Sequence, residues 1–158
     1  MPDGLSAPMS PWAPPLMREL TEMERLLVWS YRRWIAGLRT REDIHWTLVW
    51  RELCCTFGRE DGGNFFVGLQ KAVTEICQHA RRPLRLHPPC CSLVCLDELW
   101  LPSLVAACER RDYGTARIRA ESLVKADGMP CLLEASSRMA TVLRGRSITL
   151  PDRAAALD

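Results

Sequence analysis

The segment Leu20–Leu38, LTEMERLLVWSYRRWIAGL, decides the expected fold class because its apolar residues recur at helical spacing. One stripe consists of Leu20, Met23, Leu27, Tyr31, Trp34 and Leu38. The opposite, polar side carries Glu22, Arg25, Arg32 and Arg33. Thr21 and Glu24 have the spacing of a capping box, which marks a helix start. The pattern predicts an amphipathic helix over about 16–38 that buries one face.

Two more helices are expected before residue 83. Thr40 can cap the first of them, and Gly58 is a natural end for it. Its apolar side consists of Trp46, Val49, Trp50, Leu53 and Phe57. A loop is then expected at 59–63, after which Asn64 can cap a third helix that Pro83 stops.

Residues 82–95, RPLRLHPPCCSLVC, interrupt the helical pattern, and Pro88-Pro89 prevents a long strand there. The helical pattern resumes near Asp97-Glu98. Because Pro102 lacks a backbone N–H, we expect it to kink this helix or to move its start to about residue 102. Farther on, Asp112 can cap a fifth helix, and Pro130 can open a sixth that Gly145 ends.

The fold class that follows is all-α, a compact domain of five to six helices over 16–150. It divides into a three-helix part at 16–81, an irregular loop at about 82–95, and a helical part at 96–145 that contains one αα-hairpin. A proline-rich, disordered tail is expected at 1–15 and a C-terminal tail at 151–158.

The composition bounds the function classes. The chain has 158 residues, with 21 basic and 19 acidic side chains and 47% hydrophobic residues. All but two of the basic residues are arginines, yet no segment has the positive excess that nucleic-acid binding requires, so no nucleic-acid partner is expected. No apolar run reaches the ~18 residues of a membrane span, and no signal-peptide pattern opens the chain, which predicts a cytoplasmic protein.

The stretch from Leu104 to Pro130 resembles a tetratricopeptide helix pair. The likeness rests on Leu104, Ala107, Asp112-Tyr113, Ala116, Ala120, Leu123 and Pro130. As in that repeat, the small residues allow two antiparallel helices to approach closely. An ordinary αα-hairpin with small interface residues is the alternative, and it is favoured because only one unit is present where solenoids need three or more. No family is recognised over the whole chain.

The irregular loop concentrates soft metal ligands. His87, Cys90, Cys91 and Cys95 lie within nine residues, and Cys77 and His79 end the preceding helix. Zinc takes four nitrogen or sulfur ligands, and an iron–sulfur cluster takes thiolates. The spacing differs from the usual pairs of ligands, so idle or buried thiols are the alternative, and no cofactor is the more favoured expectation.

Trp29 falls on the polar side of the first helix, among Arg25, Arg32 and Arg33. Tryptophan beside arginine is the composition of a binding hot spot. A shielded surface indole is the alternative. These residues are the predicted partner-binding set.

The leading functional hypothesis is a non-catalytic, cytoplasmic protein-interaction or regulatory protein. It would use the first helix or the 104–130 hairpin to bind another protein or a second copy of itself. The rival hypothesis is a metal-binding or thiol-redox protein that uses the His87–Cys95 loop. A small cysteine-dependent enzyme comes third, because no Walker loop, dinucleotide fingerprint or nucleophile elbow occurs.

Overall fold

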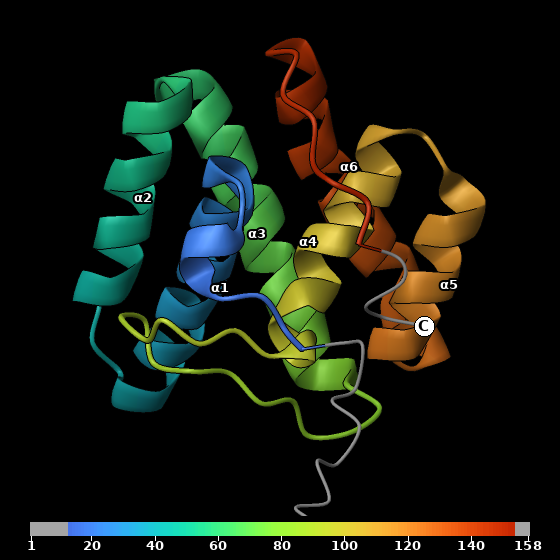
Figure 1. Ribbon diagram of the computed structural model, residues 1–158, viewed down its shortest axis with the longest axis horizontal. Coiled ribbons are helices and arrows are strands. Elements are labelled where there is room, and N and C mark those ends of the chain that lie inside the picture. The colour runs from blue at the N-terminus through green and yellow to red at the C-terminus, as the bar shows by residue number, and fades with distance from the viewer. Residues whose placement is uncertain (1–12, 154–158) are drawn as a thin grey trace, which may run out of the picture.

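Six α-helices and two short 3-10 helices form residues 13–153, which are the residues that the computed structural model describes (Figure 1). They are η1 (Met17–Glu19), α1 (Glu22–Thr40), α2 (Ile44–Phe57), α3 (Arg59–His79), α4 (Leu96–Glu109), α5 (Tyr113–Leu123), η2 (Ala126–Gly128) and α6 (Met129–Gly145). In this part of the chain extended pairing is limited to two isolated bridges. The all-α prediction is confirmed. Of the expected N-terminal tail at 1–15, residues 1–12 lie outside the described part of the chain.

The first long helix begins at Glu22 and not near residue 16. Its capping box is the one expected: the Thr21 hydroxyl accepts from the Glu24 N–H at 3.3 Å, and the Glu24 carboxylate accepts from the Thr21 N–H at 2.7 Å. The residues before the cap take a different path. Leu16 forms a bridge with Leu93, and the Met17 N–H donates to the Ser92 carbonyl at 2.9 Å. The residues that were expected to form the first turn of this helix therefore pair with the distant 82–95 loop instead.

The predicted loop at 59–63 is wrong, since α3 begins at Arg59, and Asn64 is not a cap. Gly58 alone joins the two helices, with a φ of 81° that favours glycine. Gly62 lies inside α3 because α2 passes so close that a Cβ there would lie 2.8 Å from the Leu53 carbonyl oxygen. Gly58 therefore serves the turn, whereas Gly62 serves close helix packing.

Thr40 does not cap α2. It is the last residue of α1, and its hydroxyl donates to the Ala36 carbonyl at 2.9 Å. The expected shift of the next helix start to Pro102 is also wrong, because α4 begins at Leu96 and runs through Pro102. Its start is fixed by Glu98, whose carboxylate accepts from the Cys95 N–H at 3.0 Å. The predicted Asp112 cap on α5 is confirmed, with Asp112 accepting from the Thr115 N–H at 3.1 Å.

The helices pack as two groups around one core. In Figure 1, α1, α2 and α3 lie on the left and α4, α5 and α6 on the right, and segment 80–95 crosses below α1 and α4. The two groups meet most closely at α3 and α6, where a Cβ on Gly68 would lie 3.0 Å from the Ala135 carbonyl oxygen. The side chains of Leu69, Leu104 and Met139 are fully buried between them.

Residues 146–153 pack back onto the domain and are not a free tail. Leu150 is buried, the Arg146 guanidinium donates to the Phe57 carbonyl, and Arg153 forms an ion pair with Glu24. The rest of the predicted C-terminal tail, 154–158, lies outside the described residues. Among the helices of residues 13–153, none is long and apolar enough to span a membrane.

Candidate functional site

Helix α1 and the residue before its cap bury a second stripe that the sequence analysis did not predict. Leu20, Glu24, Val28 and Arg32 lie four residues apart on one face, and each is at most 3% exposed. Two of these four residues carry charges. A buried charge is costly unless it is paired and hydrogen-bonded, so the partners of Glu24 and Arg32 are structurally important.

Arg32 is paired with Glu98 of α4, and both side chains are completely buried. Its Nε donates to Glu98 Oε1 at 2.7 Å and its Nη2 donates to Oε2 at 2.9 Å, a bidentate pair. The remaining N–H groups donate to carbonyls of the loop, including that of Cys91 at 2.7 Å and that of Leu93 at 2.5 Å. The prediction that Arg32 lies on the exposed, partner-binding side of α1 is wrong.

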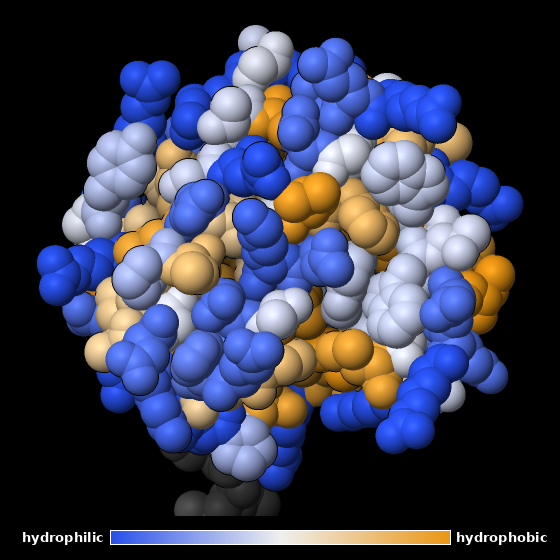
Figure 2. Space-filling view, turned by 180° about the vertical axis from the view of Figure 1, so that it is seen from behind, coloured by the Kyte–Doolittle hydropathy of each residue, from blue (hydrophilic) through white to orange (hydrophobic). Residues whose placement is uncertain are grey.

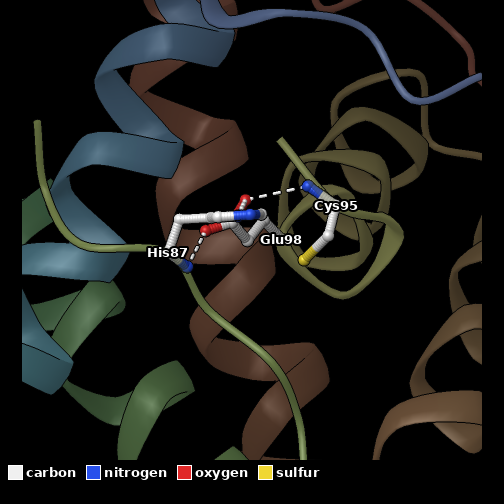
Figure 3. Close-up of side chains that lie close together, drawn as sticks. All are labelled: His87, Cys95 and Glu98. Atoms are coloured by element: carbon white, nitrogen blue, oxygen red, sulfur yellow. Dashed lines mark hydrogen bonds and ion pairs between the residues drawn. The ribbon is translucent and has the colours of Figure 1, made fainter. Parts of the chain in front are cut away.

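Glu98 also holds His87 and Cys95 in place (Figure 3). Its carboxylate accepts from the backbone N–H of His87 at 2.6 Å and of Cys95 at 3.0 Å. The His87 Nδ1 atom lies 3.1 Å from Glu98 Oε2. Because an ionised carboxylate only accepts, Nδ1 carries the proton in this contact. One carboxylate therefore ties α1, α4 and the 82–95 loop together. We call Arg32, His87, Cys95 and Glu98 the loop hub.

These contacts keep Glu98 ionised. Burial alone would raise its pKa, but the hydrogen bonds from Arg32 and from the Cys95 and His87 backbone outweigh this and lower the pKa to about 2. The carboxylate consequently carries its charge, and holds the loop, at any pH near neutrality.

The structure brings together only part of the predicted metal set. Ligand atoms of His87, Cys95 and Glu98 all lie within 4.8 Å of one another. Cys90 and Cys91 are outside this group, and Cys90 is exposed. The nearby pair on α3 is also outside it: Cys77 is exposed, and His79 faces Glu75 at 3.5 Å.

The chemistry of the loop hub suits a structural cross-link better than a cation site. Both oxygens of Glu98 already accept hydrogen bonds, and the buried Arg32 cation would repel a metal ion placed beside them. The Cys95 thiol donates to the Arg85 carbonyl at 3.1 Å. A zinc ion would need the thiolate, and burial raises the pKa of Cys95. The same raised pKa disfavours Cys95 as a nucleophile beside His87.

Trp29 lies in a groove of about 670 Å³, where α1 faces the second half of α2 and the C-terminal segment. We call it the Trp29 groove. Its apolar surface comes from Met17, Met23, Leu26, Trp29 and Ile148, and its polar rim includes Glu22, Arg25 and Glu52. Trp29 is half-buried and packs against the core. The Arg33 guanidinium lies over its ring at 5.6 Å.

The rim of the Trp29 groove carries free negative charge. Neither Glu22 nor Glu52 has a hydrogen bond or ion pair with any residue of 13–153, and both are exposed. Arg25 lines the same rim and keeps its positive charge, because its Nη1 donates to the neutral Leu20 carbonyl at 3.2 Å, so the two carboxylates outnumber it. The groove therefore combines an apolar floor with two unpaired carboxylates. On the face of the molecule opposite to the one seen in Figure 1, hydrophilic side chains separate the apolar ones into several groups (Figure 2).

Sequence reasoning missed Glu98 and Glu24, the two carboxylates on which the loop and the C-terminal segment depend. A signal was present at Val28, because an apolar residue four positions from both Glu24 and Arg32 extends the buried face of the helix beyond the first stripe. The distant partners Arg32 and Arg153 left no trace in the local pattern.

No protein-family model, curated protein or solved structure matches the chain. The likeness of 104–130 to a tetratricopeptide pair is thus without support from a family match. In the structure α4 and α5 are consecutive, packed helices joined by residues 110–112. Function has to be argued from the sites themselves.

Proposed function

We propose that the protein is a non-catalytic, cytoplasmic interaction module that binds a peptide segment of a partner protein in the Trp29 groove. The single observation that carries this proposal is the open, apolar floor of the groove, centred on a half-buried tryptophan. Tryptophan and methionine are enriched at the centres of protein interfaces, where they supply most of the binding energy.

The charges on the rim suggest the chemistry of the segment. Glu22 and Glu52 are unpaired, so a lysine or arginine of the partner would find a carboxylate there, and the approach of a basic segment would be favoured. The floor takes apolar side chains. The expected occupant is therefore an amphipathic segment with an apolar face and flanking basic residues.

The test is selection from a displayed peptide library against the whole immobilised protein. We expect enrichment of amphipathic, basic peptides, and loss of their binding in Trp29→Ala and in Glu52→Arg. The matched control is Glu134→Arg, an exposed glutamate that lines a different groove on α6, which should leave binding unchanged.

Three results would overturn the proposal. One is enrichment of sequences without an apolar face, and another is equal loss of binding in the control. The third is concentration-dependent self-association in sedimentation that Trp29→Ala abolishes, because a second copy of the chain would then be the occupant.

A further inference from the structure

A second concave feature borders the loop hub at His87 and Cys95. It is a hollow of about 470 Å³ between the last turn of α1 and the loop, lined by Arg39, Leu84, Arg85, Leu86, His87 and Cys95. A neighbouring, more apolar hollow of about 340 Å³ shares Arg39, Leu84 and Leu86 with it. Together they offer a polar pocket with an apolar extension.

Two of the lining arginines are unpaired. Neither the Arg39 nor the Arg85 guanidinium has a hydrogen bond or ion pair with any residue of 13–153, and both side chains are on the surface. This is unusual in a chain whose other loop-facing arginines are engaged: Arg32 with Glu98, and Arg82 with Asp97 at 3.1 Å.

The two carboxylates that contact the loop already accept hydrogen bonds from other arginines. Asp97 accepts from Arg82 and from the Arg85 backbone N–H at 2.8 Å, and Glu98 is occupied by Arg32. Asp97 and Glu98 each have one arginine as a direct partner, Arg82 and Arg32, and the charge of Arg85 also helps to lower the pKa of Asp97. With these pairs formed, Arg39 and Arg85 give the lining of the hollow an excess of positive charge.

His87 adds a fixed polar atom. Its Nδ1 contacts Glu98 and its backbone N–H is held by the same carboxylate, so the ring cannot turn freely and Nε2 is its remaining polar atom. The ring borders the hollow and is 30% exposed. The contacts with Glu98 therefore make His87 a rigid part of the wall of the hollow.

We propose that this hollow binds a small organic dianion, a phosphate monoester that carries a compact apolar group. Two unpaired guanidinium groups match a doubly charged phosphate, which arginine binds through paired N–H donors. The proposal assigns contact with a further oxygen to His87, whose ring borders the hollow. Leu84 and Leu86, with the adjoining hollow, receive the apolar group. This site is separate from the Trp29 groove, and the proposal does not depend on that function.

The test is calorimetric titration of the full chain with phenyl phosphate, with amide chemical shifts to locate the site. We expect saturable binding with shifts confined to residues near Arg39 and 84–87. Arg39→Gln and Arg85→Gln should each weaken binding roughly tenfold or more, since each removes charged hydrogen bonds. Arg51→Gln, on an exposed arginine of α2 that also lacks an ion pair, should leave binding unchanged.

Two further ligands test the charge and the apolar contact separately. Inorganic phosphate should compete with phenyl phosphate but bind more weakly, and benzoate, with one charge, should bind more weakly as well. The proposal is overturned by absence of saturable binding, by shifts that map elsewhere, or by equal weakening in Arg51→Gln, which would indicate unspecific attraction. Unchanged melting temperatures in the two arginine variants exclude loss of folding as the cause.

Discussion

The loop hub and the Trp29 groove are opposites in how they use polar groups. In the loop hub, Arg32 and Glu98 are fully buried and every contact is directed at another part of the same chain. In the groove, Glu22 and Glu52 are exposed and unpaired, and the tryptophan beside them is half-buried. In the loop hub, Arg32 and Glu98 use their hydrogen-bonding groups within the fold, whereas the exposed carboxylates of the groove remain available to a partner.

Because of this difference, the residue types alone would suggest the wrong role for each of the two regions. Histidine, cysteine and glutamate at one place indicate a metal or catalytic site, yet the contacts around Glu98 make that place a cross-link. A surface tryptophan among charges carries no catalytic chemistry, yet it borders the larger opening. A binding site differs from a structural cluster more by its accessibility and its unpaired polar groups than by its residue types.

The largest expected effect comes from breaking the loop hub at Glu98. Glu98→Gln keeps the shape of the side chain but leaves the buried Arg32 cation without its counter-charge. We expect a loss of roughly 3–5 kcal/mol in the free energy of unfolding, measured by urea denaturation. The double variant Arg32→Met, Glu98→Met removes both charges. Its loss of unfolding free energy should be smaller than the sum of the losses in Arg32→Met alone and Glu98→Met alone. Additive losses would show that the two residues do not interact.

Acid should weaken the loop hub without any mutation. The pKa of Glu98 is lowered from 4.5 to about 2 in the folded protein, so its contribution to stability is complete above pH 4.5 and is lost as the pH falls toward 2. Glu24 and Asp97, whose pKa values are also lowered, act in the same direction. The wild type should therefore lose more stability than Glu98→Gln over this interval. Parallel curves for the two proteins would contradict the role of Glu98.

A smaller effect is expected at the ion pair between Arg153 and Glu24, which joins the C-terminal segment to α1. The C-terminal segment forms one wall of the Trp29 groove. Arg153→Ala removes the partner of Glu24, which is 2% exposed but keeps its hydrogen bonds to Thr21. We expect a loss of about 1–3 kcal/mol in the free energy of unfolding. Hydrogen exchange should accelerate at 148–150 but not in the 82–95 loop. Acceleration in both regions would mean that the two are not independent.

The smallest effect on stability should come from the rim of the groove. Glu52→Arg changes an exposed side chain without a partner, so the free energy of unfolding should change by no more than about 0.5 kcal/mol. Binding of a basic peptide should nevertheless be lost. If this variant unfolds as readily as Glu98→Gln, the contrast between an open groove and a closed cross-link is wrong.

Local pattern was enough for the helices and for several of their ends. The capping box at Thr21 and the Asp112 cap depend on residues three apart, and Pro130 suits a helix start by its own geometry, so the sequence displays all three directly. Local pattern wrongly predicted a loop around Gly62, because glycine is required there by the close approach of a neighbouring helix. It failed at Pro102 because the helix start is held by Glu98, whose side chain is fixed by partners far along the chain.

The sequence by itself determined an all-α chain with an irregular cysteine-rich loop, and it identified Trp29 as a residue to examine. Only the tertiary structure decided which charges are buried. Arg32 and Glu98 are 66 residues apart, and Glu24 and Arg153 are 129 apart, so each pair exists only once the chain has folded. Hydrophobic periodicity acts over a few residues and can therefore be read locally, whereas the pairing of buried charges is a property of the whole fold.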